Sequence, residues 1–213
     1  MLSGIDISHH NKNMKDVSAI NDFDFVIMKA SEGCTYQDTS RKQFSMALNE
    51  DTLRGYYHFA RPENGNSARG EAMNFIYAVS PYLNKKPLLA LDVEAGALNF
   101  KDLDNWVEEW CKVVMEYTHV KPLIYTSEAE TYRFKKAAAL GCGLWCAKWS
   151  NNKPKKISPW KFWAIWQYSS KGNVSAVRTD LNYFNGTREQ FVKYCEAVNN
   201  GKKNSGDTDN TRD

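Results

Sequence analysis

Two carboxylic acids, separated by a single residue, close the most apolar short segment of the chain. Residues 87–94 read Pro-Leu-Leu-Ala-Leu-Asp-Val-Glu, so Asp92 and Glu94 end a predicted buried strand. Because alternate side chains of a strand share a face, both carboxylates point the same way, with Cα atoms roughly 6.5–7 Å apart. Burial and repulsion raise the pKa of one member, which can then act as a general acid beside an ionised partner. Such a pair fits hydrolysis of a glycosidic bond, although acids are also common at solvated strand ends.

Two further acids lie in the first and last predicted strands. Asp6 belongs to Gly-Ile-Asp-Ile-Ser, and Asp180 belongs to Thr-Asp-Leu-Asn-Tyr. If the sheet closes into a barrel, these two strands become neighbours and their acids meet at the same site. Four carboxylates from three strands then converge, which favours a catalytic site over a set of solvated strand ends.

Two other kinds of site fit the sequence less well. A metal site would use histidines beside these carboxylates, but no His-Glu-x-x-His or similar spacing is present. A nucleophile at Ser8 is disfavoured because neighbouring strand residues point to opposite faces, and the chain has no Gly-x-Ser-x-Gly turn. The sequence therefore implies neither a metal nor another cofactor. The histidines considered as metal ligands are His9, His10 and His58.

Charge and hydropathy exclude several classes of protein. The chain has 28 Lys and Arg residues against 25 Asp and Glu, and a net charge of +3 is too small to indicate a nucleic acid partner. No apolar stretch reaches about 18 residues, so we expect no membrane insertion. The five cysteines are odd in number and scattered, which favours free, mostly buried thiols in a reducing compartment.

Short apolar runs alternate with helical patterns along the first two thirds of the chain. The runs are nearly continuous in apolar residues, as expected for parallel strands covered on both faces. Apolar stripes at helical spacing predict helices over 68–79 and 103–117. Capping boxes expected at Ser127 with Glu130 and at Thr187 with Gln190 predict two more helix starts, and apolar residues from Phe191 to Val198 continue the second of these helices. The five predicted strands span 4–8, 25–31, 55–60, 87–94 and 122–127.

The pattern changes after Ser127. Residues 143–149, 162–169 and 176–184 are typical of strands, but the segments between them do not predict helices. The sequence therefore predicts an α/β fold: an irregular, flattened TIM-like barrel of five βα units followed by three strands without helices. We expect residues 1–200 to form a single catalytic domain. Residues 201–213 contain no large apolar residue and are predicted to be a flexible tail or the start of a linker.

Six short stretches resemble one family, the Chalaropsis-type lysozymes of glycoside hydrolase family 25. The likeness extends over residues 3–198, and the ordered set is far more specific than the Asp-x-Glu pair alone. The family fold is a flattened barrel of five strand-helix units and three extra strands, which agrees with the pattern above. The matching stretches are Gly4-Ile5-Asp6-Ile7-Ser8, Lys29-Ala30-Ser31-Glu32-Gly33, Gly55-Tyr56-Tyr57-His58-Phe59-Ala60-Arg61, Leu91-Asp92-Val93-Glu94, Trp166-Gln167-Tyr168 and Asp180-Leu181-Asn182.

The resemblance implies cleavage of the β-1,4 bond between N-acetylmuramic acid and N-acetylglucosamine in the glycan strands of bacterial peptidoglycan. By position, Glu94 matches the proton donor and Asp92 its partner acid, while Asp6 and Asp180 match the remaining acids of the site. Asp92 could act as nucleophile, activate water, or steady the 2-acetamido group of the substrate; we favour the last. Residues near strand ends are expected to bind sugar: Tyr57, His58, Tyr125, Trp149 and Gln167.

Two other functions are possible for a barrel with such a cleft, and the sequence also suggests a biological setting. A cleft that binds wall glycans without cleaving them is disfavoured because all four acids are present. A chitinase-like barrel is disfavoured because the chain lacks the Asp-x-x-Asp-x-Asp-x-Glu pattern. Without a recognisable secretory signal, the chain resembles a phage endolysin made in the host cytoplasm and acting at the cell wall, with a further C-terminal wall-binding domain. A secreted bacterial autolysin that has lost its leader is the alternative.

Overall fold

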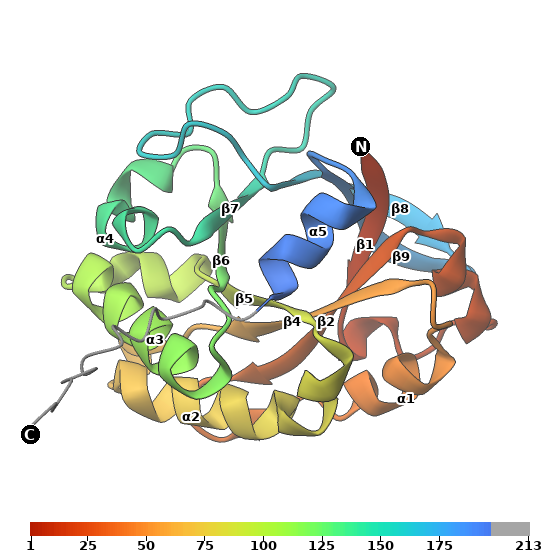
Figure 1. Ribbon diagram of the computed structural model, residues 1–213, viewed down its shortest axis with the longest axis horizontal. Coiled ribbons are helices and arrows are strands. Elements are labelled where there is room, and N and C mark those ends of the chain that lie inside the picture. The colour runs from red at the N-terminus through yellow and green to blue at the C-terminus, as the bar shows by residue number, and fades with distance from the viewer. Residues whose placement is uncertain (197–213) are drawn as a thin grey trace, which may run out of the picture.

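The computed structural model describes residues 1–196, and its centre is a closed barrel of strands (Figure 1). The sheet order is β1-β9-β8-β7-β6-β5-β4-β2-β3, and a further pairing of β1 with β2 closes it. The expected tail at 201–213 and Val198, expected in the last helix, lie outside the described residues. The strands are β1 (Leu2–Ile7), β2 (Phe25–Glu32), β3 (Tyr36–Gln37), β4 (Leu53–Phe59), β5 (Leu88–Asp92), β6 (Leu123–Ser127), β7 (Gly143–Ala147), β8 (Ile165–Val174) and β9 (Val177–Phe184).

The predicted barrel is confirmed, with small differences in its connections. Strands β1, β2, β4, β5, β6, β7 and β8 pair in parallel, and β9 runs antiparallel to both of its neighbours. The segment between β7 and β8 crosses over without a helix, as predicted. The unit after β1 contains only the 3-10 helices η1 (His9–Asn11) and η2 (Val17–Asp22). The short strand β3, which pairs with the end of β2, was not predicted.

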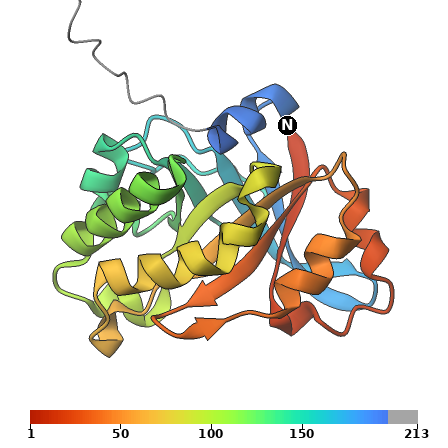
Figure 2. The same cartoon turned by 60° about the horizontal axis from the view of Figure 1, so that its bottom comes forward.

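Four α-helices lie outside the barrel, and Figure 2 shows α1, α2 and α3 covering its outer surface. Their apolar faces pack against the outward side chains of the strands in one large core, which includes Phe75 and Trp110. The helices are α1 (Ser40–Ala47), α2 (Ala68–Val79), α3 (Leu103–Thr118) and α4 (Lys135–Ala139); the short 3-10 helices are η3 (Pro62–Asn64), η4 (Ser80–Lys85), η5 (Ala95–Asn99) and η6 (Thr131–Arg133). No helix among residues 1–196 is both long and apolar enough to cross a membrane.

One of the two predicted capping boxes is present. The side chain of Thr187 accepts from the backbone of Gln190, whose side chain bonds back, and this pair opens α5 (Arg188–Cys195). The box predicted at Ser127 is wrong, because Glu130 bonds to Ser127 through the main chain in a turn and η6 begins one residue later without a side-chain cap. The polar pattern there marks a turn after β6 rather than a helix start.

Helix α5 fills one end of the barrel and leaves the other end open. In Figure 1 it lies across the middle of the ring of strands. Its Phe191 packs against Phe25 at the start of β2 and Phe184 at the end of β9, with ring centroids 5.3 and 5.1 Å apart. Because β9 is antiparallel to the others, both positions belong to the amino-terminal end of the barrel. The carboxyl ends of the parallel strands remain for a site, as in other barrels of this kind.

Candidate active site

A polar pocket of about 210 Å³ lies at the carboxyl ends of the parallel strands. It contains all four acids that the sequence singled out, together with aromatic, amide and basic side chains. Strand alternation explains why these residues share the pocket, because each faces the barrel interior from its own strand or the loop after it. The lining residues are Asp6, Ser8, His10, Lys29, Tyr57, Phe59, Asp92, Glu94, Tyr125, Trp145, Gln167 and Asp180.

Asp6 and Asp180 face each other across the closure of the barrel. They are direct partners in the antiparallel register of β1 and β9, so their side chains project from the same face at the same level. Burial and the neighbouring charge of Asp180 raise the pKa of Asp6 to about 7, against the hydrogen bonds it accepts. Burial also raises the pKa of Asp180, with Arg178 opposing the shift. This pair therefore holds a proton well above the pH at which an exposed aspartate loses it.

Two amide side chains hold the Asp6 carboxylate in place. Gln167 Nε2 and Asn182 Nδ2 both donate to Asp6 Oδ2, at 2.9 and 2.7 Å. Each amide is itself oriented by an indole, because Trp149 Nε1 donates to Gln167 Oε1 at 2.9 Å and Trp145 Nε1 donates to Asn182 Oδ1 at 2.8 Å. The indoles can only donate, so they fix which end of each amide faces Asp6.

Asp92 ends β5 and is nearly buried, whereas Glu94 lies two residues further on, just past the strand. Val93 between them points outward into the core, so both carboxylates face the pocket. Burial, then repulsion from Glu94, raises the pKa of Asp92 well above its usual range. Burial, then the charge of Asp180, raises the pKa of Glu94. Asp92 Oδ1 is buried and has no hydrogen-bond partner among residues 1–196, which makes ionisation of this carboxyl group more costly. The residue nevertheless lines the polar pocket.

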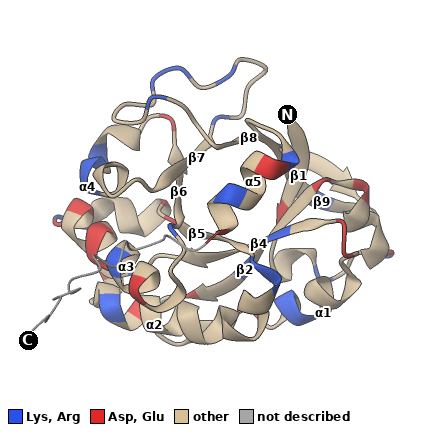
Figure 3. Ribbon diagram, in the orientation of Figure 1, with Lys and Arg blue, Asp and Glu red and all other residues tan. Residues whose placement is uncertain are grey.

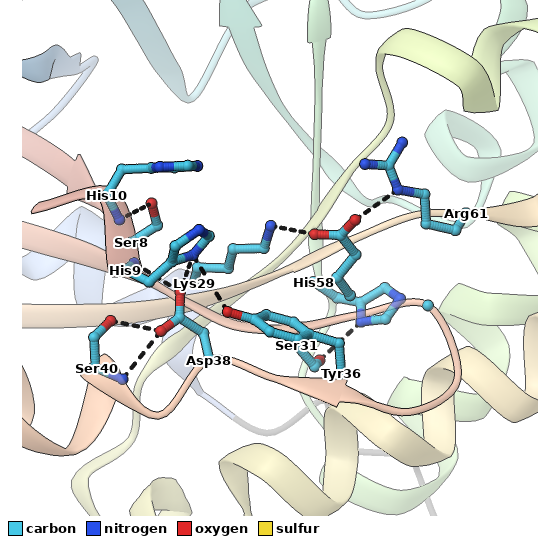
Figure 4. Close-up of polar contacts among 12 residues, drawn as sticks. Ser8, His9, His10, Lys29, Ser31, Tyr36, Asp38, Ser40, His58 and Arg61 are labelled. Atoms are coloured by element: carbon cyan, nitrogen blue, oxygen red, sulfur yellow. Dashed lines mark hydrogen bonds and ion pairs between the residues drawn. The ribbon is translucent and has the colours of Figure 1, made fainter.

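A short chain of alternating charges lies at the rim of the pocket. Lys29 Nζ contacts Glu32 Oε2 at 2.5 Å, and Glu32 Oε1 accepts from Arg61 Nε at 2.7 Å (Figure 4). Both cations lie over the ring of Phe59, at 4.7 and 4.4 Å from its centroid. Lys29 favours the ionised forms of Asp92 and Glu94, and so limits the rise in their pKa values.

A second, more open pocket of about 280 Å³ adjoins the first. It is largely apolar and shares Glu94 and Tyr125 with the polar pocket. Trp149 forms one wall, with 66% of its surface exposed, and Leu98 and Ala147 contribute further apolar surface. An exposed indole beside a carboxyl group offers a flat surface on which a sugar ring can stack.

The predicted sugar-binding residues divide into two groups. Tyr57, Tyr125, Trp149 and Gln167 all line one or both pockets. His58 does not: its ring is fully buried on the outward face of β4, with Nε2 2.8 Å from Glu71 Oε2. Its Nδ1 lies 2.8 Å from Ser31 Oγ (Figure 4). Its neighbour Tyr57 takes the inward position, and alternation sends His58 outward. We therefore withdraw His58 as a sugar-binding residue and assign it to packing.

Three residues in or next to the pocket were not predicted from the sequence. Asn182 bonds to Asp6, Trp145 orients Asn182, and Lys29 lines the pocket. Alternation could have found Asn182, since it lies two residues after Asp180 on the same strand. The alternative of a metal site gains no geometric support, because residues 1–196 bring no three His, Cys, Asp or Glu side chains together in a metal-binding arrangement.

The chain belongs to a family of glycoside hydrolases. Residues 5–177 match the family described as Glycosyl hydrolases family 25. Lysozyme M1 of Streptomyces globisporus is 30% identical over 90% of this chain and 70% of its own length. The crystal structure of the lysozyme from Streptomyces coelicolor superposes with a TM-score of 0.80 at 26% identity, covering 91% of this chain and 96% of that one. The family 25 lysozyme of Aspergillus fumigatus has a TM-score of 0.75 at 29% identity, covering 92% and 99%.

Proposed function

We propose that this protein is a lysozyme, which hydrolyses the β-1,4 bond between N-acetylmuramic acid and N-acetylglucosamine in bacterial peptidoglycan. One observation carries the proposal: Glu94 lines both the polar and the apolar pocket. A glycan with one sugar in each pocket places the oxygen that joins them beside this carboxyl group. Membership of family 25, with lysozymes among the similar proteins, supports the same activity.

Glu94 is the proposed proton donor. Burial and the charge of Asp180 raise its pKa, which favours the protonated form that a leaving oxygen needs. As the bond to the anomeric carbon breaks, the proton passes to the glycosidic oxygen, and N-acetylglucosamine departs with that oxygen as a hydroxyl group. The deprotonated carboxylate of Glu94 can then act as a general base and remove a proton from the water molecule that completes hydrolysis.

Asp92 is the proposed partner of the 2-acetamido group of the reacting sugar. Its carboxyl group lines the polar pocket and can accept the acetamido N–H, while the acetamido carbonyl oxygen attacks the anomeric carbon. In the free protein, burial and Glu94 raise the pKa of Asp92. The hydrogen bond from the substrate would stabilise ionised Asp92, while Glu94 keeps the proton that it donates. The first product should retain the configuration of the substrate, and NMR of the anomeric proton during early turnover measures this. An inverted product would refute acetamido participation.

Asp6 and Asp180 are proposed to position the reacting sugar and to tune the pKa of Glu94. Asp180 raises that pKa directly, and Asp6 is held rigidly by its two amide donors. Neither needs to form a bond with the substrate carbon. Tyr57, Tyr125, Trp149 and Gln167 complete the two pockets as contacts for the sugars or for the acids.

Release of reducing ends from purified Gram-positive cell walls tests the proposal, with wild type compared with Glu94→Gln. New muramic acid reducing ends are expected, with a loss of at least about 100-fold in the variant, typical of removing a general acid. Clearing that persists in Glu94→Gln would move the proton donor elsewhere. Binding without cleavage by wild type would favour a wall-binding module, and hydrolysis of chitin oligomers alone would favour a chitinase-like enzyme.

We propose that the protein acts at the bacterial cell wall, where its substrate lies. Endolysins are among the proteins of similar structure: the chain superposes on 69% of the CTP1L endolysin with a TM-score of 0.72 and 26% identity. A phage origin and a separate wall-binding domain stay predictions of the sequence.

A further inference from the structure

Basic residues are concentrated in one segment of the chain. Residues 131–179 contain ten Lys and Arg side chains and no Asp or Glu. The whole chain has 28 basic and 25 acidic side chains, so the remainder carries 18 basic against 25 acidic ones. The net charge of the whole chain is only +3, but residues 131–179 carry a charge of +10 and the remainder a charge of −7. This separation creates a local positive potential.

The lysines of this segment gather on the loop between β7 and β8, where Figure 3 shows basic positions and no acidic ones. Lys153, Lys155 and Lys156 are all exposed. Glu128 holds the loop through its main chain, accepting from the backbone N–H groups of Lys155 and Lys156 at 2.6 and 3.0 Å. The three ammonium groups thus remain available on a backbone that is anchored. We call Lys153, Lys155 and Lys156 the basic loop.

No ammonium group of the basic loop forms an ion pair within residues 1–196, and the nearby Glu128 carboxylate pairs with Lys148 instead. Within residues 1–196, the ion pairs formed by lysines of the basic segment are those of Lys136 with Glu108 and of Lys148 with Glu128. None involves the basic loop. Three exposed positive charges without ion pairs create a local positive potential that attracts an anionic partner.

The basic loop continues the wall of the apolar pocket. Trp149 forms that wall beside Glu94, and the next residue back, Lys148, bonds through Nζ to the carbonyl of Lys153 at 3.4 Å. Ser127, on the same wall, directly precedes Glu128, which anchors the loop. A polymer that leaves the apolar pocket over Trp149 therefore passes onto the basic loop.

We propose that the basic loop binds carboxylates carried by the same glycan strand, on muramic acid residues and their attached peptides beyond the cleavage site. This inference rests on the proposed function and names the part of the substrate that the loop contacts. Flexible lysines suit carboxylates at variable spacing, because each ammonium is a point charge on a long stem rather than a rigid bidentate group. Such contacts at a rim speed association and weaken as salt rises.

Binding to insoluble peptidoglycan tests the inference, with all proteins carrying Glu94→Gln so that the polymer stays intact. The variant Lys153→Gln/Lys155→Gln/Lys156→Gln keeps the main-chain bonds to Glu128. The matched control, Lys42→Gln/Lys85→Gln/Lys112→Gln, removes the same charge from exposed positions on other elements. The peptidoglycan is first stripped of its phosphodiester polymers, and one portion then has its carboxylates converted to neutral amides.

The basic-loop variant should bind stripped peptidoglycan about tenfold more weakly than the control at low salt, with the difference shrinking at high salt. On amidated peptidoglycan the two should bind alike. Equal binding to stripped peptidoglycan would refute the proposal, and a difference seen only on unstripped walls would assign the loop to phosphodiester polymers instead. Wild-type release of reducing ends from the stripped material is followed in parallel. Its absence would refute the lysozyme activity, whatever the binding shows.

Discussion

Replacing Asp6 with asparagine is expected to make the protein more stable at alkaline pH while removing activity. Asparagine has nearly the shape of aspartate and keeps an oxygen for the bonds from Gln167 and Asn182. It removes a carboxyl group whose pKa burial and Asp180 raise from 3.8 to about 7. A raised pKa in the folded state means that the stabilising contribution is fully present below pH 3.8. It is lost as the pH rises through about 7.

The size of the effect follows from these two values. Ionisation of Asp6 in the unfolded chain favours unfolding by about 1.7 kcal/mol at pH 5 and about 4 kcal/mol at pH 8, because the folded protein resists the same ionisation. Asparagine has no such dependence. The stability of Asp6→Asn relative to wild type should therefore increase by about 2.5 kcal/mol between pH 5 and pH 8.

Urea denaturation followed by tryptophan fluorescence at pH 5, 6.5 and 8 measures this difference directly. Thermal unfolding should show the gap in Tm widening by roughly 5 °C over the same range. Asp51→Asn, at an exposed position, is the control and should show little change with pH. If the gap between Asp6→Asn and wild type stays constant or narrows as the pH rises, Asp6 is ionised in the folded protein and the account of its burial is wrong.

Three further predictions concern the site and its support. His58→Ala should cost about 3 kcal/mol in urea denaturation, because it leaves a buried cavity and removes a hydrogen bond to the buried Glu71, yet leave KM unchanged; a raised KM would mean that His58 contributes to substrate binding. Trp149→Ala should raise KM about tenfold in wall-digestion kinetics, and Trp149→Phe less, since the ring remains without its bond to Gln167. Wild-type activity should fall as the pH rises through the raised pKa of Glu94, and Asp180→Asn should move that limb of the pH–rate profile to lower pH. If the alkaline limb of the profile stays at the same pH in Asp180→Asn, Asp180 does not raise the pKa of Glu94.

Local patterns in the sequence were enough to predict the main elements. Continuous apolar runs marked the parallel strands, because strands covered on both faces cannot alternate with polar residues. The lack of a helical pattern between residues 149 and 162 correctly predicted a crossover without a helix. Apolar stripes correctly placed α2 and α3. The same local signal failed at Ser127 and Glu130, since a turn and a helix start use the same polar residues.

Alternation along single strands, which is also local, carried much of the site. It placed Asp92 and Glu94 on one face, and both line the polar pocket. The same alternation puts Tyr57 and His58 on opposite faces, so the prediction that both bind sugar could not hold, and the sequence did not show which of the two faced inward. Both the inside and the outside of this barrel are packed with apolar residues, so burial patterns do not distinguish them.

What the sequence determined about this protein is therefore the type and order of its elements, and the acids that end them. The tertiary structure decided how these acids interact. The pairing of Asp6 with Asp180 depends on the register of β1 against β9, whose residues lie at opposite ends of the chain. The two amide donors that hold Asp6 depend on the same closure. The joining of two pockets at Glu94 depends on the placement of β5, β6 and β7 side by side. A pKa is set by burial and by the charges within a few ångströms, and only the folded chain establishes those distances.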